Sequence, residues 1–372
     1  MTEPNFRLVP YRLLPCVDWV LYGVALLLMG FGLVTLWGAT SGGVGPGAIE
    51  GYAGRQLVWA TMGMALMSGL IVFEYRGLRR LTWILYSLIV LALLMLLLEG
   101  IAIKGARSWY SVGPIRVQPS EVAKVIIVLT LAHDLARRAC TFRKLHHTFI
   151  PLLIVALPIL LILRQPDLGT AVVFIPVTGA MFWVAGLRKR VIVLFLIAGV
   201  ALGGAGYPHL KPYQQERIKT FLNPEADPRG KGHNIIQAQT TLGSGQLVGR
   251  GWGRGTQTSL RFLPEYHTDF IFPTIGEQFG FMGCLLAVAL FTLMIGRMFW
   301  LASVTRNLYG LLIITGLTTM LATHVVLNIG MTIGLLPITG LPLPFFSYGG
   351  SFMLTCTASI GLVLSIGARR GL

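Results

Sequence analysis

The chain has 372 residues, of which 54% are hydrophobic and only 12% are charged, with a mean hydropathy of +0.72. A soluble core needs far less apolar surface, so this composition excludes a soluble protein and predicts a polytopic membrane protein. The net charge of +16 would suit a nucleic-acid-binding protein only if the basic residues shared one face, but they alternate along the chain.

Apolar runs of about 20 residues, the length of a helix that crosses a bilayer, recur along almost the whole chain. The predicted fold class is therefore all-α, with about ten transmembrane helices in one bundle and a single domain over 1–372. One long loop, 208–268, separates the seventh span from the eighth. The expected spans are 17–39, 56–73, 81–99, 119–136, 148–164, 169–186, 190–207, 270–296, 308–336 and 345–367.

The distribution of Lys and Arg predicts the orientation of these spans. With a cytoplasmic amino terminus, the inner segments hold clusters such as Arg76, Arg79 and Arg80, whereas the short outer loops hold isolated residues such as Arg55 and Arg164. The positive-inside rule then places both termini in the cytoplasm and the long loop outside. Within that loop, IIQAQTTL (235–242) is expected to form a short helix.

Ionisable groups at or inside the membrane are costly, so each indicates a pathway, a site or an ion pair. Asp269 lies in FLPEYHTDFIF (262–272) at the start of the eighth span, and Glu277 lies about two turns deeper. Glu121 and Lys124 lie at the outer end of the fourth span. With the basic residues of the outer segments they predict one outward-facing, positively charged cavity. Those basic residues are Arg55, Arg107, Arg116 and Arg217.

A cationic cavity at the level of the headgroups suits a lipid-linked diphosphate. The segment LPLPFFSYGGS (341–351) adds a helix start, with Ser347, Gly349 and Gly350 in its opening turn, where free backbone N–H groups could meet a phosphate. A divalent cation, Mg²⁺ or Mn²⁺, bridging the diphosphate is compatible with this chemistry, although no cluster of protein ligands demands one. No organic cofactor is expected.

Four segments resemble the SEDS (shape, elongation, division, sporulation) glycosyltransferases, and within them the RodA branch more than the division paralogue FtsW. They are WYSVGPIRVQPSEVAK (109–124), RQPDLGTA (164–171), GSGQLVGRGWGRGTQTSLRFLPEYHTDFIFPTIGEQFGFMG (243–283) and NIGMTIGLLPITGLPLPFFSYGGS (328–351). The resemblance covers nearly the whole chain. It implies a peptidoglycan polymerase of the bacterial cytoplasmic (inner) membrane, acting in cell elongation and shape maintenance. The implied substrate is lipid II, the undecaprenyl-diphosphate-linked disaccharide pentapeptide, and the implied partners are a class B penicillin-binding protein and other membrane proteins of the elongation complex.

The resemblance also implies roles for individual residues. The Asp of the HTDFIF segment is the catalytic residue of the family, which here is Asp269. The Glu and Lys of QPSEVAK correspond to Glu121 and Lys124, and the matching basic cavity residues are Arg55, Arg116 and Arg217.

The chain departs from the family pattern at three places. Many relatives have two carboxylates where this chain has Glu277 followed by Gln278. Ser108 separates Arg107 from Trp109, whereas an Arg often directly precedes the Trp. Pro273 follows HTDFIF where a small residue is common.

Forming a β-1,4 link from an α-linked sugar diphosphate in one inverting displacement requires a base and charge stabilisation for the leaving diphosphate. Asp269 is the expected base for the 4-hydroxyl of the acceptor GlcNAc. Candidates for the diphosphates are Lys124, Arg116, Arg217 and Arg55.

Other interpretations stay open. Asp269 also suits a helix cap, Glu121 and Lys124 equally suit an internal ion pair, and His267 is the second candidate base. Asp167 with Arg164 is expected to brace a turn, and Glu277 to be a hydrogen-bonded packing residue.

Two other functions remain as alternatives: a lipid II flippase, and a non-catalytic scaffold that activates a penicillin-binding protein. A flippase should also place polar groups at the midplane and on the inner side, whereas the charges here favour the outer side. A scaffold has no use for a lone carboxylate in the cavity.

Overall fold

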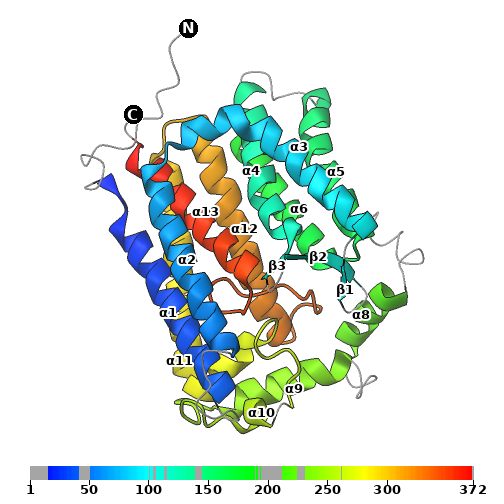
Figure 1. Ribbon diagram of the computed structural model, residues 1–372, viewed down its shortest axis with the longest axis vertical. Helices are drawn as coiled ribbons and strands as arrows, with labels where there is room; N and C mark the ends of the chain where they lie inside the picture. Colours follow the sequence, from blue (N-terminus) through cyan, green and yellow to red (C-terminus); the bar gives the residue numbers. More distant parts are fainter. Residues whose placement is uncertain are drawn as a thin grey trace.

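The computed structural model describes residues 16–41, 51–99, 101–103, 106–112, 115–138, 145–188, 190–191, 193, 212–223, 231–260 and 262–370. Long helices run side by side in one bundle, and the first and last of them begin and end at the same end of it (Figure 1). These helices are α1 (Trp19–Ser41), α2 (Tyr52–Val72), α3 (Tyr75–Glu99), α4 (Pro119–Arg138), α5 (Phe149–Arg164), α6 (Leu168–Val184), α11 (Ile271–Val304), α12 (Leu308–Thr332) and α13 (Gly350–Ala368).

Each of these nine helices matches one of the ten predicted spans, and the remaining span, 190–207, lies almost entirely outside the described residues. Among the described residues, six helices are long and apolar enough to cross a membrane, and α5 and α6 are shorter apolar helices. Large apolar side chains such as Leu98, Phe149 and Trp183 are exposed on the outside of the bundle, as contact with lipid requires. The chain is therefore a multi-pass membrane protein with an all-α membrane fold.

The centre of the bundle is formed by α12 and α13. In their most apolar stretches 67% and 89% of the residues are buried, against 22% in α2 and in α3. Close approach of α13 to α2 requires glycine, since a side chain at Gly361 would lie 2.9 Å from the carbonyl oxygen of Met67. Small residues at such crossings replace the hydrophobic driving force that a bilayer does not supply.

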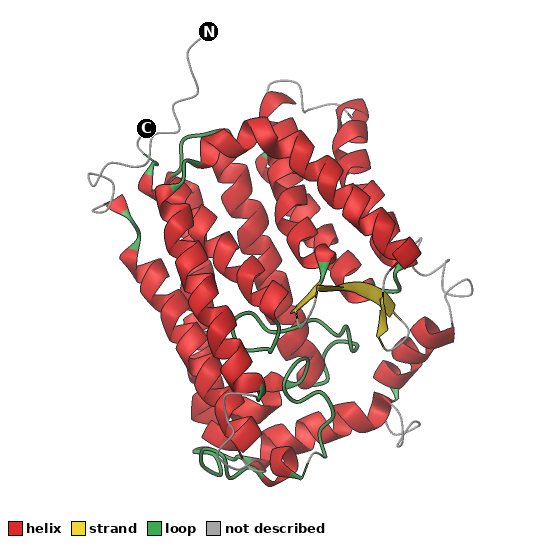
Figure 2. Ribbon diagram, in the orientation of Figure 1, coloured by secondary structure: helices red, strands yellow, loops and turns green. Residues whose placement is uncertain are grey.

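A small antiparallel sheet connects α3 to α4 and was not expected from the sequence. Its strands are β1 (Ile101–Ile103), β2 (Ala106–Val112) and β3 (Ile115–Val117), in the order β1-β2-β3. Arg107 pairs with Ala102, and Arg116 pairs with Ser111. The sheet lies at the end of the bundle opposite to that where α13 ends (Figure 2), so it adds backbone structure beside the predicted cavity.

The long polar segment is ordered where it is described. It forms α8 (Pro212–Leu222), α9 (Lys231–Ser244) and α10 (Thr256–Ser259), and α9 contains the short helix that IIQAQTTL predicted. In Figure 1, α9 and α10 lie across the lower end of the bundle, beneath α1 and α11, and α8 lies at the lower right, near β1. A short 3₁₀ turn, Leu145–Thr148, precedes α5.

Helix α11 is broken at Gly280, whose φ of +67° lies in the left-handed region. The loop that follows α9 supplies hydrogen-bond partners at the break. The N–H of Phe281 donates to the carbonyl of Gln246 (2.8 Å), and the N–H of Arg250 donates to the carbonyl of Glu277 (2.9 Å). The first part of α11, which follows Asp269, is thus hydrogen-bonded to the loop after α9 and separated by the break from the longer part of the helix.

Candidate functional site

Asp269 lies at the end of a turn immediately before α11, at the end of the bundle where α9 and α10 lie. The N-cap position of α11 belongs to Phe270, so Asp269 stands one residue outside the helix. The side chain is half-buried. A methyl group built on Gly340 would lie 3.5 Å from its Oδ2 atom, so the carboxylate faces the chain that leads from α12 to α13.

Two segments hold the backbone around Asp269 in place. The Nδ2 of Asn328, on α12, donates to the carbonyls of Asp269 (2.9 Å) and Leu341 (2.7 Å). The N–H of Tyr348 donates to the carbonyl of His267 (2.8 Å). The α12–α13 connection is therefore hydrogen-bonded, directly and through Asn328, to the residues that precede α11. Sequence reasoning missed Asn328, although a buried amide in an apolar helix is a signal for such a role.

The α12–α13 connection is itself strained. Phe345 is fully buried with a φ of +67°, which is costly for a bulky residue. Its carbonyl packs against Gly32 of α1, where no side chain would fit. Strain of this kind persists only where the surroundings over-determine it, and it is concentrated at functional sites.

Only part of the predicted helix opening is observed, because α13 begins at Gly350 and not at 345. Gly349 is the N-cap and Gly350 the first helical residue, whereas Ser347 lies before the helix. The Ser347 hydroxyl donates to the carbonyl of Thr268 (2.6 Å) and accepts from the N–H of Leu343 (2.8 Å). The N–H of Gly349 donates to Oε1 of Gln56 (3.2 Å). These groups are occupied within the protein. A side chain on Gly350 would collide with the Trp59 indole, which accounts for the glycine.

Glu121 and Lys124 form a buried ion pair with a third member, His324 of α12. The Lys124 ammonium lies 2.8 Å from Oε2 of Glu121 and 2.8 Å from Nε2 of His324. The Nδ1–H of His324 can donate to the carbonyl of Met320 (2.9 Å), which leaves Nε2 as the acceptor from Lys124. The three residues are 3%, 1% and 0% exposed. The ion-pair interpretation is thus the observed geometry, and His324 was not anticipated.

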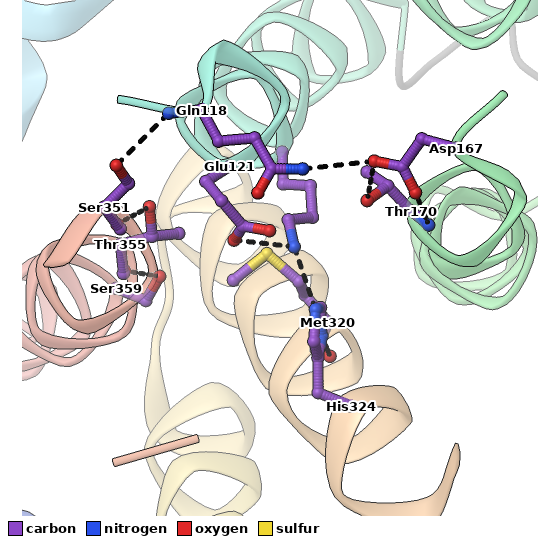
Figure 3. A network of polar contacts seen from close by, with 10 residues as sticks. Gln118, Glu121, Asp167, Thr170, Met320, His324, Ser351, Thr355 and Ser359 are labelled. Atoms are coloured by element: carbon purple, nitrogen blue, oxygen red, sulfur yellow. Dashed lines mark hydrogen bonds and ion pairs between the residues drawn. The ribbon is translucent and has the colours of Figure 1, made fainter. Parts of the chain in front are cut away.

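Gln118 joins the starts of three helices (Figure 3). Its N–H donates to Oγ of Ser351 on α13 (3.2 Å), and its Nε2 donates to Oδ2 of Asp167 (3.2 Å). Asp167 caps α6 by accepting from the N–H (3.1 Å) and the hydroxyl (2.8 Å) of Thr170. Asp167 braces its turn as expected, but in the part of the chain that the structure describes its partners are Gln118 and Thr170 and not Arg164.

Two of the four predicted cavity arginines have described side chains, and both are exposed: Arg55 in the first turn of α2 and Arg116 on β3. The carbonyl of Arg116 accepts from Oγ of Ser351 (3.4 Å), which places β3 beside the start of α13. Arg107 lies on β2 and Arg217 on α8, and their side chains lie outside the described part of the structure.

Glu277 is fully buried and directed toward α10. It accepts hydrogen bonds from the N–H groups of Gln257 (2.7 Å) and Thr258 (3.1 Å), and from the hydroxyl of Thr258. This is the arrangement of a hydrogen-bonded packing residue, which connects α10 to α11.

Among the long helices of the bundle, α2, α4, α6, α11 and α13 begin at the end where α9 and α10 lie (Figure 1). Helix starts carry partial positive charge and free N–H groups, so this end of the bundle favours anions. Within the described residues, no three His, Cys, Asp or Glu side chains gather as a metal site.

Comparisons with known proteins agree with this geometry. A family model described as "Cell cycle protein", for FtsW, RodA and SpoVE, matches residues 18–371. The chain is 35% identical to the peptidoglycan glycosyltransferase MrdB of Escherichia coli strain K12, over 93% of this chain and 92% of that protein.

Two solved structures have the same fold. One belongs to a peptidoglycan synthase complex that coordinates polymerization and crosslinking, with a TM-score of 0.82 and 33% identity, covering 95% of this chain and 98% of that chain. The other is the rod shape determining protein RodA of Thermus thermophilus, with a TM-score of 0.72 and 30% identity, covering 96% and 98%.

Proposed function

Because the chain belongs to the FtsW, RodA and SpoVE family of cell cycle proteins, we propose that it is a peptidoglycan glycosyltransferase that polymerises lipid II. Its relatives include proteins named peptidoglycan glycosyltransferase and rod shape determining protein, which supports a role in cell elongation and shape. The proposed location is the bacterial inner membrane, with both termini cytoplasmic and the site on the outer face. The whole chain acts as one domain, with 208–268 as its outer part.

The observation that carries this proposal is the placement of Asp269. The half-buried Asp269 lies just before α11, on a turn whose backbone is hydrogen-bonded to Asn328 and to the α12–α13 connection. A general base needs such a fixed position within hydrogen-bond reach of the proton that it takes. In the proposed reaction Asp269 accepts the proton of the acceptor's 4-hydroxyl. That oxygen attacks the anomeric carbon of the donor, and the lipid diphosphate leaves with inversion.

The leaving diphosphate requires positive charge, which the starts of α4, α6 and α13 provide near this end. Of the four predicted cavity arginines, Arg55 and Arg116 are exposed there, and Arg107 and Arg217 are proposed to join them. Lys124 is buried against Glu121 and His324, so we assign it to the electrostatic support of the site more than to direct contact. A Mg²⁺ or Mn²⁺ ion would add positive charge at the leaving diphosphate, and it would be held by the substrate, since the described residues offer no cluster of three His, Cys, Asp or Glu side chains.

The proposed partner is a class B penicillin-binding protein, with other membrane proteins of an elongation complex. The similar chain from a synthase complex that couples polymerization to crosslinking supports this pairing. A polymerase releases strands that a transpeptidase must crosslink, so the two activities belong together.

The test is the substitution Asp269→Asn, assayed in detergent with the penicillin-binding protein and lipid II. Asparagine keeps the size and the hydrogen bonding of the side chain but removes its basicity. Polymer that muramidase digests should fall by roughly 10²-fold or more, the usual contribution of a positioned base. Folding and partner binding should be unchanged.

Two results would contradict the proposal. If the Asp269→Asn variant polymerises lipid II at the wild-type rate, Asp269 is not the general base of the reaction. Wild-type protein that moves lipid II across liposomes, yet makes no polymer with any partner, would favour a flippase.

A further inference from the structure

Four rings gather beside Asp269 from three segments of the chain. Tyr52, in the first turn of α2, stacks on the imidazole of His267 with centroids 4.3 Å apart and an interplanar angle of 23°. Tyr348 meets Tyr52 edge-on at 4.9 Å, and Tyr266 meets His267 edge-on at 5.2 Å. His267 and Tyr348 are joined by the backbone hydrogen bond that fastens the α12–α13 connection. The rings are therefore part of the scaffold that holds the proposed base.

The arrangement leaves one face of Tyr52 free of these rings. The centroids of His267 and Tyr348 lie 6.2 Å apart, so with separations of 4.3 Å and 4.9 Å they subtend about a right angle at Tyr52. His267 thus covers one face of the phenol ring, and Tyr348 meets its edge. Tyr52 is 41% exposed, which is consistent with an open opposite face.

The side of α2 that carries Tyr52 faces the site and not the lipid. One turn on, Gln56 is buried, and its Nε2 donates to the carbonyl of Ser347 (3.0 Å). Trp59, a further turn on, packs on the start of α13 at Gly350. Leu57 and Val58 are the exposed apolar residues of the same stretch and lie on its other side. A tyrosine that only anchored the helix at the membrane interface would be expected among those residues.

We propose that the open face of Tyr52 is a stacking platform for a pyranose ring of the acceptor glycan strand; this rests on the proposed function. Sugars joined by β-1,4 links carry their substituents equatorially, so axial C–H groups cover both ring faces. Such C–H groups complement the negative face of an aromatic ring. Tyr52 stacks on a residue only two positions from Asp269, at most about 7 Å of chain, which matches the acceptor side of the reaction.

The supporting rings explain why a single exposed tyrosine suffices. His267 behind Tyr52 and Tyr348 at its edge restrict the phenol, so little side-chain entropy is lost when a sugar binds. This assigns His267 to support of the platform and not to the role of second base.

The test measures binding of a water-soluble β-1,4-linked N-acetylglucosamine tetramer to the purified full-length protein in detergent, by isothermal titration calorimetry. Tyr52→Leu should weaken binding roughly tenfold, which corresponds to about 1.4 kcal/mol, the upper range of a single aromatic contact. Tyr52→Phe keeps the ring and should bind within about twofold of wild type. Leu57→Ala, on the lipid side of the same helix, is the matched control and should bind like wild type. Thermal unfolding of all four proteins checks the fold.

Equal binding by wild type and Tyr52→Leu, or no binding by wild type at millimolar tetramer, would overturn the platform. A polymerisation assay of the same proteins separates this result from the proposed function. Wild-type protein that makes no polymer while its tetramer binding depends on Tyr52 would contradict the glycosyltransferase proposal and leave the sugar site standing. Polymerisation by wild type together with tetramer binding that does not depend on Tyr52 would support the glycosyltransferase proposal and contradict the stacking platform.

Discussion

Asp269 and Lys124 are both ionisable residues near the same end of the bundle, but they differ in burial and in their partners. Asp269 is half-buried on a turn, with its backbone fixed from α12. Lys124 is 1% exposed, and its ammonium is shared between Glu121 and His324. A buried charge with two partners depends on both of them, because removing one partner leaves an uncompensated charge in a medium of low polarity.

Lys124→Ala is therefore expected to destabilise the protein as well as to reduce activity. It leaves the Glu121 carboxylate buried without its cation, at a cost of about 3–5 kcal/mol in the free energy of unfolding. The double variant Glu121→Gln/Lys124→Met removes both charges and should recover most of that stability. Thermal unfolding in detergent and polymerisation of lipid II are measured on both variants.

The double variant separates two roles of Lys124. A stable double variant that remains inactive shows that the charge itself serves the reaction. Recovery of activity together with stability would show that the pair is structural, contrary to the electrostatic role proposed here.

At the scale of elements, α11 shows how the loop between α9 and α11 positions the candidate site. The helix breaks at Gly280, and backbone groups of 246–251 bond to both sides of the break. Glu277, in the part of α11 before the break, accepts hydrogen bonds from α10 and so connects the two helices. The loop therefore orients the part of α11 that follows Asp269. In an unbroken helix this part would instead have to follow the axis of the rest of α11.

Gly280→Ala should damage both stability and activity. Alanine at this position would have to keep the positive φ of Gly280, which costs roughly 1–2 kcal/mol. Its Cβ would also collide with the backbone nitrogen of Gly249. Gly296→Ala is the matched control in the same helix, because a Cβ there meets nothing within 4 Å. That variant should be neutral or more stable by roughly 0.5–1 kcal/mol. Similar unfolding temperatures for the two variants would show that the break is not needed.

At the scale of the whole molecule, the ends of the bundle have different chemistry. The end opposite the site is held by arginines: Arg297 pairs with the buried Asp18 (2.7 Å), and Arg369 donates to the carbonyls of Ile71 and Val72 at the end of α2. Burial lowers the pKa of Arg369, yet a guanidinium stays charged at neutral pH. Arg297 and Arg369 therefore help to pack the bundle at this end.

The proposed orientation predicts which cysteines an impermeant maleimide can reach in intact spheroplasts. Val248→Cys, at an 81% exposed position beside α9, should react. Arg306→Cys, in the exposed turn between α11 and α12 at the opposite end, should react only after the membrane is permeabilised. The reverse pattern would place Asp269 on the cytoplasmic side and would contradict the proposed function.

Composition and the recurrence of apolar runs determined the membrane class and nine of the described helices. These features are local in the chain, because a span needs only length and hydropathy. The importance of the segments around Asp269 came from their resemblance to a known family. The start of α13 was predicted five residues early, since nothing local shows that 345–349 forms a turn and an irregular segment, held by Gln56 and by the carbonyls of 267–268.

Only the tertiary structure brought His324 to Lys124, Asn328 to Asp269 and Tyr52 to His267. Each pair joins residues about 60 or more positions apart, and a hydrogen bond or ring contact at such separation depends on which helices pack together. The break at Gly280 was hidden for the same reason: a glycine inside an apolar run reads as helix until a distant loop supplies the backbone partners that make another conformation stable. The sequence therefore determined which residues could do chemistry, and packing decided which of them meet.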